Sequence, residues 1–262
     1  MIDLKGHSGC KLVLINDDKK SFVRKISKDI NYNDRIKLQC KKQENFKHSQ
    51  ILAPKVLNKG YESGLFYFDM EYVNGLKYNE FIKVNNFEHI KTIFSTILEF
   101  IFENISAKNV SFKNEIQHKI DSLLKTNLID NLIIDSLIMQ SKKPIPTGYC
   151  HGDLTFENII ISKDKIYLID FLDSYIDSPI IDISKLIQEF DLNWSNRRNK
   201  FGMSSVIKNH FLKGMLLEKI SNSSIDKNVI DLQKKLTLMR ILPYTSNLKL
   251  KLKLINIINK QI

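Results

Sequence analysis

Three polar residues near the middle of the chain surround two apolar runs. The stretch CHGDLTFENIIIS, residues 150–162, contains Asp153 and Asn158, and the segment IYLIDF that follows contains Asp170. The two runs are short, rich in isoleucine and separated by the turn SKDK, so they predict a β-hairpin. Because a hairpin folds its strand ends back on each other, we expect Asp170 near Asn158.

These residue types suit a metal ion and a general base. Asn158 and Asp170 offer hard oxygen ligands that suit Mg²⁺, which keeps water and shares the rest of its shell with phosphates. Asp153 is placed to accept a proton from an attacking hydroxyl group. A base, a metal ion and little covalent chemistry are what phosphoryl transfer needs. We therefore predict Asp153 as the catalytic residue and Asn158 and Asp170 as metal ligands.

The alternative is an ordinary polar turn, since aspartate and asparagine are common in turns. An isolated H-x-D pattern would not exclude that alternative. The longer pattern is H-x-D-x-x-x-x-N, followed by an apolar strand and I-D-F. It meets the structural context that a catalytic motif requires.

HGDLTFEN and LIDF resemble the catalytic and metal-binding motifs of the aminoglycoside phosphotransferase and choline kinase family, within the protein-kinase-like superfamily. The glycine after His151 is typical of these small-molecule kinases. SFVRKIS, MEYVNG and RILPY are more loosely similar to bacterial phosphotransferases associated with capsule and surface-sugar genes. The resemblance implies ATP- and Mg²⁺-dependent transfer of the γ-phosphate to a hydroxyl of a sugar, sugar derivative or amino alcohol. Whether ATP or GTP is preferred stays open.

The resemblance also implies a strand lysine that holds the nucleotide phosphates. The segment FVRKIS offers Arg24 and Lys25, which alternation along a strand puts on opposite faces. We favour Lys25, because Val23 then shares its inward face and packs near the nucleotide. Arg24 is the alternative.

A helix glutamate is the implied partner of this lysine. Glu44 follows Lys25 at a separation typical of the superfamily. Gln39 and Gln43 are nearby alternatives that would orient the lysine without charge. We expect Glu44, since an ion pair fixes the lysine more firmly than a glutamine.

Two backbone elements complete the nucleotide site that the resemblance implies. Gly6, Ser8 and Gly9 lie before the first clear strand, in a loop whose N–H groups and hydroxyl can meet phosphate. The loop departs from G-x-G-x-x-G, and its alternative is a plain β-turn. The segment FDMEYVNG resembles the hinge between lobes, where the Glu71 carbonyl and the Val73 N–H would pair with adenine.

The remaining motif residues have structural roles by resemblance. The segment HGDLTFEN, residues 151–158, is the expected catalytic loop. His151 is expected to hold this loop by packing and hydrogen bonding, and Asp182 to bind it from the start of a helix. Thr155 stands where protein kinases have a lysine. The γ-phosphate must therefore be met by other groups, such as Lys25, Mg²⁺ or a lysine of the C-terminal part.

The surrounding elements predict an α+β chain of two lobes, and the resemblance implies that these form the bilobal protein-kinase-like fold over residues 1–262. The N-lobe is expected over about 1–73, and a mainly helical C-lobe that carries the hairpin over about 74–262. The N-lobe is expected to be a small antiparallel sheet with one helix that starts near Asp34. Apolar residues at helical spacing predict an amphipathic helix over 87–105. Residues 182–262 are expected to be mostly helical, with breaks near Ser195, Ser221 and Pro243.

Composition bounds the partners and the compartment. The net charge of +11 indicates an anionic partner or a bias toward lysines spread over the surface. We expect a neutral or anionic acceptor, since polycationic drugs need acid-lined pockets, and we expect no nucleic acid. Three scattered cysteines and no run of about 18 apolar residues predict a cytoplasmic chain without a membrane span.

The sequence does not name the acceptor or the oligomeric state. Its pocket is expected within residues 175–245, where Trp194, Arg197, Arg198 and Tyr244 are candidates, although surface and core roles fit them equally. A protein kinase is disfavoured, since no A-P-E follows IDF. The alternative function is a nucleotide-binding pseudokinase that acts as a scaffold or regulator, which the imperfect glycine loop keeps open.

Overall fold

The computed structural model of the chain describes residues 2–4, 10–17, 20–124, 131–197 and 202–259. The chain divides into two compact units. Unit 1 comprises Met1–Phe81 and Glu157–Asp173, and unit 2 comprises Ile82–Phe156 and Ser174–Ile262. The central hairpin therefore groups with the N-terminal strands, and the lobe boundary expected near residue 73 stays a prediction.

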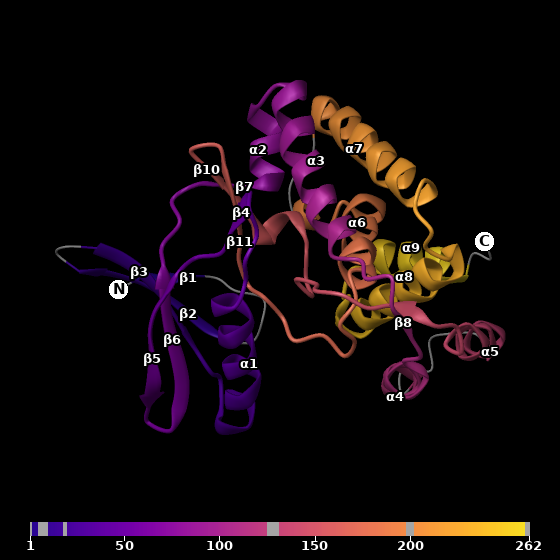
Figure 1. The fold of residues 1–262 in the computed structure, drawn as a ribbon, viewed down its shortest axis with the longest axis horizontal. Helices are drawn as coiled ribbons and strands as arrows, with labels where there is room; N and C mark the ends of the chain where they lie inside the picture. The colour runs from indigo at the N-terminus through magenta and orange to yellow at the C-terminus, as the bar shows by residue number, and fades with distance from the viewer. Residues whose placement is uncertain (1, 5–9, 18–19, 125–130, 198–201, 260–262) are drawn as a thin grey trace. The chain divides into compact units, whose positions relative to one another are not determined.

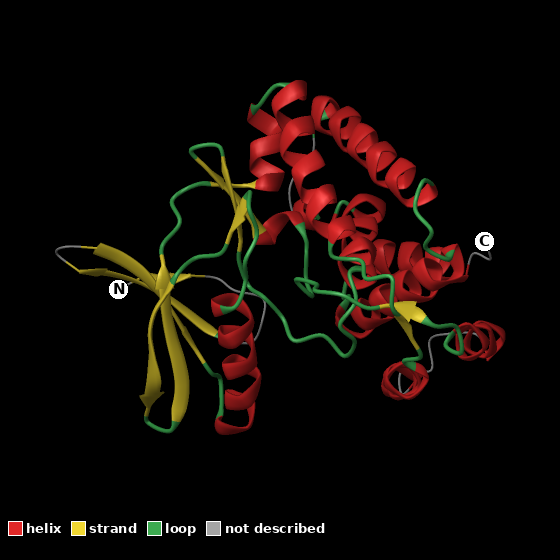
Figure 2. Ribbon diagram, in the orientation of Figure 1, coloured by secondary structure: helices red, strands yellow, loops and turns green. Residues whose placement is uncertain are grey.

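Unit 1 contains an antiparallel five-stranded sheet (Figure 2). Its strands, in spatial order, are β1 (Ile2–Leu4), β2 (Lys11–Asp17), β3 (Lys20–Ile26), β6 (Leu65–Glu71) and β5 (Val56–Glu62). β2 and β3 pair antiparallel with Leu14 opposite Val23, as expected for a small antiparallel sheet in the N-lobe. β5 was not predicted, because its polar sequence VLNKGYE lacks the apolar alternation that marks a half-buried strand.

Helix α1 (Asn33–Glu44), which the sequence predicted, packs on this sheet. The buried core of unit 1 joins Ile36 and Cys40 of α1 to Phe66, Phe68 and Met70 of β6. Burying these side chains is the main force that holds the helix on the sheet.

A second sheet of unit 1 carries the predicted hairpin, which is confirmed. Its strands, in spatial order, are β4 (Ile51–Leu52), β11 (Lys165–Leu168), β10 (Ile159–Ser162) and β7 (Leu76–Lys77). Lys163 and Asp164 link β10 to β11 with φ of 49° and 61°, the positive values of a tight two-residue turn. A Cβ at Gly75 would lie 2.4 Å from the Ile161 carbonyl oxygen, so only glycine lets the chain approach β10 there.

Unit 2 is mostly helical (Figure 1). Helix α2 (Tyr78–Val84) leads into it, and it contains α3 (Phe87–Glu103), α4 (Lys113–Leu124), α5 (Asn131–Gln140), α6 (Ile180–Leu192), α7 (Met203–Ser221), α8 (Lys227–Ile241) and α9 (Leu248–Asn259). Two short strands, β8 (Asn109–Val110) and β9 (Ile145–Pro146), pair with each other. α6 packs against α8, and α3 packs against α7.

The amphipathic helix predicted over residues 87–105 corresponds to α3, and the apolar residues at helical spacing are the ones that α3 buries. Its buried residues are Ile90, Ile93, Phe94, Ile97, Leu98, Phe100 and Ile101. The side chain of Asn86 accepts a hydrogen bond from the His89 N–H and begins the helix as an N-cap. The predicted α+β class, with an N-terminal antiparallel sheet and a mostly helical C-terminal part, is confirmed. Among the described residues, no helix is both long and apolar enough to span a membrane.

Candidate active site

The predicted site residues fall into both units. Lys25, Asn158 and Asp170 belong to unit 1, whereas Asp153 belongs to unit 2. Each group forms its own set of contacts within its unit.

In unit 1, Lys25 is bonded to Asp170. The Lys25 Nζ lies 2.5 Å from Asp170 Oδ1, and the lysine side chain is only 3% exposed. A buried ammonium group is stable only when it is paired, and Asp170 supplies that pairing. The strand β3 thus brings the Lys25 ammonium into contact with the carboxylate of Asp170, which follows β11.

The hairpin brings Asn158 to the same end as Asp170. The Asn158 carbonyl oxygen accepts a hydrogen bond of 3.0 Å from the Ile169 N–H, which directly precedes Asp170. Asp170 has a φ of 61°, a left-handed conformation that non-glycine residues seldom adopt. Such backbone strain is concentrated at functional sites, where the surrounding structure enforces it.

Contacts from α1 and from Phe46, just after it, hold the segment after Asp170 in place. The Phe171 ring is buried and lies 5.2 Å from the Phe46 ring, centroid to centroid. The Lys42 Nζ donates a 2.7 Å hydrogen bond to the Leu172 carbonyl oxygen. These contacts fix the backbone that carries the Asp170 carboxylate.

The Asn158 and Asp170 side chains fit a magnesium ion by their chemistry. An amide oxygen and a carboxylate are hard ligands, and Mg²⁺ commonly takes only one or two protein groups beside water and phosphate oxygens. The described residues contain no group of three histidine, cysteine, aspartate or glutamate side chains that would hold a metal ion by themselves. The set therefore suits a metal ion shared with a phosphate ligand.

Arg24, the alternative to Lys25, is engaged elsewhere. Its Nε and Nη2 donate hydrogen bonds of 2.7 and 2.9 Å to the two carboxylate oxygens of Asp69. Its guanidinium also lies 4.1 Å from the centre of the Tyr67 ring. The bidentate pair commits Arg24 to the other face of β3, so the geometry favours Lys25.

The expected Lys25–Glu44 ion pair is wrong for this structure. Glu44 Oε1 lies 2.7 Å from the Nζ of Lys59, a residue of β5, because Glu44 faces the strand that the sequence did not reveal. Gln43 also has other partners, since its Nε2 donates to the Pro54 carbonyl oxygen at 2.7 Å. The Gln39 side chain is 1% exposed, and its amide has no hydrogen-bond partner among the described residues.

Two further predictions concern the glycine loop and the hinge of the nucleotide site. Gly6, Ser8 and Gly9 lie outside the described residues. Glu71 is the last residue of β6, and Val73 lies in the link between β6 and β7. Their backbone roles toward adenine stay predictions.

In unit 2, α6 holds the catalytic-loop backbone. The Asp182 carboxylate accepts hydrogen bonds from the N–H groups of His151, at 2.6 Å, and Gly152, at 2.9 Å. His151 is fully buried, and its Nδ1 accepts a 3.3 Å hydrogen bond from the Asp153 N–H. These contacts agree with the structural roles expected of His151 and Asp182.

The end of the loop is fixed in the core of unit 2. The Phe156 ring lies 6.4 Å from the Phe94 ring and 5.5 Å from the Phe190 ring, centroid to centroid. Its N–H donates a 3.3 Å hydrogen bond to Glu189 Oε2. The sequence places Asp153 three residues before this fixed aromatic.

Two cations face the Asp153 carboxylate. The Lys185 Nζ lies 2.6 Å from Asp153 Oδ1, and the Arg240 Nη2 lies 3.7 Å from the same oxygen. Burial raises the pKa of the Asp153 carboxyl, but the charges of Lys185 and Arg240 outweigh it, so the pKa lies below its ordinary value. Asp153 is therefore an ionised carboxylate at neutral pH.

Sequence reasoning did not single out Lys185 or Arg240. Lys185 lies one helical turn after Asp182 in the segment DISK, so both residues belong to the same face of α6. That spacing was the available signal. Arg240 comes from α8, and no sequence pattern reveals its approach to the loop.

The four residues expected to line an acceptor pocket differ in their surroundings. Arg197 lies over the Trp194 ring at 4.1 Å and donates a 2.6 Å hydrogen bond to the Trp194 carbonyl oxygen. Tyr244 is 86% exposed, and Arg198 lies outside the described residues. Their contact with an acceptor stays a prediction.

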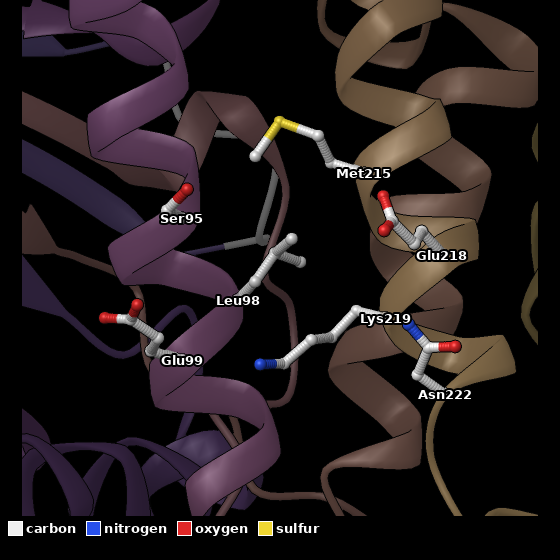
Figure 3. A pocket seen from close by; sticks show the side chains of 7 residues that line it. All are labelled: Ser95, Leu98, Glu99, Met215, Glu218, Lys219 and Asn222. Atoms are coloured by element: carbon white, nitrogen blue, oxygen red, sulfur yellow. The ribbon is translucent and has the colours of Figure 1, made fainter.

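A pocket of about 200 Å³ lies elsewhere in unit 2, between α3 and α7 (Figure 3). Its lining residues are Ser95, Leu98, Glu99, Met215, Glu218, Lys219 and Asn222. Figure 3 shows Lys219 extending from α7 toward α3. The pocket includes no residue predicted to bind nucleotide, metal or acceptor.

Comparisons with known proteins agree with this geometry. The model of the phosphotransferase enzyme family matches residues 117–201, which include the catalytic loop, the hairpin and all of α6. No curated protein matches the chain.

The chain resembles solved structures of small-molecule kinases at low identity. A thermostable mutant of the aminoglycoside phosphotransferase APH(4)-Ia is 13% identical, with a TM-score of 0.66 over 98% of this chain and 92% of that one. A putative fructosamine-3-kinase from Haemophilus somnus 129PT is 18% identical, with a TM-score of 0.58 over 99% of this chain and 92% of that one. The amicoumacin kinase hAmiN, in complex with AMP-PNP, Ca²⁺ and Ami, is 14% identical, with a TM-score of 0.56 over 98% and 86%. Residues 117–201 therefore match the phosphotransferase enzyme family, and the chain has the fold of the aminoglycoside phosphotransferases.

Proposed function

We propose that the chain is an ATP- and Mg²⁺-dependent phosphotransferase that moves the γ-phosphate to a hydroxyl group of a small molecule. The observation that carries the proposal is the buried Lys25–Asp170 pair, at the hairpin end that also holds Asn158. Unit 1 therefore contains both a cation that can bind phosphate, Lys25, and two oxygen ligands for a metal ion, Asn158 and Asp170.

Within unit 1, each group has a distinct role toward the nucleotide. The Lys25 ammonium would bind phosphate oxygens. Asn158 and Asp170 would hold Mg²⁺, which would neutralise charge on the phosphates. The backbone of Glu71 and Val73 is proposed to bind adenine, and the loop of Gly6, Ser8 and Gly9 to cover the phosphates.

Within unit 2, Asp153 acts on the acceptor. Its carboxylate orients the acceptor hydroxyl and takes its proton, while the acceptor oxygen forms a bond to the γ-phosphorus. The bond from that phosphorus to the bridging oxygen breaks, and ADP leaves with its electron pair. The charges of Lys185 and Arg240 lower the pKa of Asp153 against the effect of burial, so its carboxylate is ionised and can accept the proton of the hydroxyl.

The cations beside Asp153 support a neutral or anionic acceptor. Lys185 and Arg240 face the carboxylate that meets the acceptor hydroxyl, and Arg240 is 41% exposed. Ammonium groups on a polycationic acceptor would be repelled there, whereas a phosphate or carboxylate would be attracted. Sugars, sugar phosphates and sugar acids therefore fit better than aminoglycosides. An ATP-dependent reaction and cysteines that form no disulfide also support the expected cytoplasmic location.

The test is a screen of neutral, anionic and amino sugars for ATP consumption and labelled phosphate transfer with Mg²⁺. Transfer that is lost in Asp153→Ala supports the phosphotransferase. Nucleotide binding without transfer to any acceptor supports the pseudokinase. A native chain that binds neither nucleotide nor acceptor contradicts both.

A further inference from the structure

Lys185 is a buried lysine with a specific partner in the catalytic loop. Its side chain is 4% exposed, and its Nζ lies 2.6 Å from Asp153 Oδ1. An ammonium group so far from water is destabilising unless it is paired, so its retention in the core needs a reason.

One turn of α6 holds both parts of the loop. Asp182 binds the N–H groups of His151 and Gly152, and Lys185, one turn later, binds the Asp153 side chain. The loop HGDLTFEN has no lysine or arginine of its own. Among the residues that the structure describes, the cation closest to the carboxylate is Lys185 of this helix, at 2.6 Å, followed by Arg240 at 3.7 Å.

We propose that Lys185 is a positioning residue of the transfer reaction, which holds the Asp153 carboxylate ionised and in a single orientation toward the acceptor hydroxyl. The proposal rests on the proposed function, because it assigns Asp153 the role of base. Lys185 keeps its own proton throughout, and the proton of the acceptor goes to Asp153.

The charged groups around the pair support this role. Lys185 faces Asp153, Arg240 and Asp182, while Asp153 also faces His151. Burial lowers the pKa of Lys185, and Asp153 opposes that effect without reversing it. Burial alone would raise the pKa of Asp153, so the ionised carboxylate depends on the adjacent cations.

A matched buried pair provides the control. Lys235 and Asp231 of α8 lie 2.9 Å apart, and both side chains are 6% exposed. Lys235→Met removes a buried lysine from an aspartate, as Lys185→Met does, but away from Asp153. Both variants are expected to lose stability, since each removes the cation closest to an aspartate carboxylate, although Asp153 keeps Arg240 and is 23% exposed.

The first measurement is an NMR titration of the Asp153 carboxyl carbon in the full chain labelled with carbon-13 aspartate. Asp153→Asn assigns the signal. We expect Lys185→Met and Lys185→Gln to raise the titration midpoint, and Lys235→Met and Lys185→Arg to leave it low. Glutamine keeps a hydrogen-bond donor without charge, so it serves if the methionine variant does not fold. An unchanged midpoint in the charge-removing variants overturns the proposal.

The second measurement is turnover with an acceptor from the screen. We expect Lys185→Met to lower kcat by about 10–100-fold with little change in KM for ATP. In an Asp153→Asn background, the same substitution is expected to change kcat little, because Lys185 acts through Asp153. If Lys185→Met lowers kcat by the same factor in the native chain and in Asp153→Asn, the proposal is contradicted. The titration needs no turnover, so absence of transfer in the native chain contradicts the proposed function but not the charge relationship.

Discussion

The Nζ of Lys25 and Oδ1 of Asp170 lie 2.5 Å apart within unit 1. The lysine comes from β3 and the aspartate from the segment after β11, so sequence-distant elements form one ion pair. In the proposed function both residues serve the same ligand, Lys25 through the phosphates and Asp170 through the metal ion. Their contact keeps the buried ammonium paired.

Removing the Lys25 charge is expected to weaken nucleotide binding. Lys25→Met should raise the Kd for Mg·ATP about 10–100-fold, the effect of losing one hydrogen bond to a charged group. Arg24→Met is the matched control, because Arg24 adjoins Lys25 in β3 but binds Asp69. Calorimetry with both variants checks this. Equal losses of affinity in the two variants would contradict the choice of Lys25.

Asp170 is expected to make nucleotide binding depend on magnesium. In the native chain, adding EDTA should weaken binding, because the phosphates lose a metal bridge to the protein. In Asp170→Ala the affinity should be low with or without Mg²⁺. Asp173→Ala, an exposed acid paired with Arg35 at 3.3 Å, should behave like the native chain. Unchanged Mg·ATP affinity in Asp170→Ala would remove it from the metal site.

The catalytic role of Asp153 predicts a loss of rate without a loss of binding. Asp153→Ala should lower kcat by about 10²–10⁴-fold, the usual effect of removing a positioned base. The affinity for Mg·ATP should persist, since the nucleotide groups belong to unit 1. Single-turnover assays with the acceptor found by screening measure the first effect and calorimetry the second. Full turnover would exclude Asp153 as the base.

The sequence revealed elements whose signals are local. The hairpin, α1 and the amphipathic α3 follow from apolar periodicity and turn residues. Asn158 and Asp170 were placed correctly near each other, because register across a two-stranded hairpin depends on only a few adjacent residues.

The sequence did not predict features that depend on tertiary contacts. The polar strand β5 was missed, and its Lys59 binds the glutamate that was assigned to Lys25. Lys185 and Arg240 reach Asp153 from separate helices, so their role depends on how α6 and α8 pack. Helix periodicity identifies a buried face, but not which charged residue on it meets a loop.

Stability at low pH should depend on Asp226, the N-cap of α8. Its side chain accepts a hydrogen bond from the Asn228 N–H and lies 2.7 Å from the Lys143 Nζ. These contacts, first the one with Lys143, lower its pKa from 3.8 to about 2. The stabilisation is therefore complete above pH 3.8 and is lost as the pH falls through about 2.

Asp226→Ala should cost about 1 kcal/mol of unfolding free energy at neutral pH through loss of the cap. The exposed ion pair with Lys143 adds little. Asp226→Asn keeps a capping oxygen and is the control, so most of the stability should return. Urea unfolding of the three chains at pH values on either side of the transition measures both effects. An equal loss in the two variants would show that charge, rather than capping, stabilises α8.

Arg240 is expected to set the preference for an anionic acceptor. Its Nη2 lies 3.7 Å from Asp153 Oδ1 and its side chain is 41% exposed, so a ligand that approaches the carboxylate can reach it. Arg240→Gln should raise KM for a sugar phosphate or sugar acid about 10–100-fold, the effect of one charge-assisted hydrogen bond. The KM for the matching neutral sugar should change little. Competition assays that pair each anionic acceptor with its neutral counterpart measure the difference, with Lys234→Gln, one turn and a half earlier on α8, as the control. Equal effects on neutral and anionic acceptors would restrict Arg240 to its contact with Asp153, because a residue that only supports the base slows every acceptor alike.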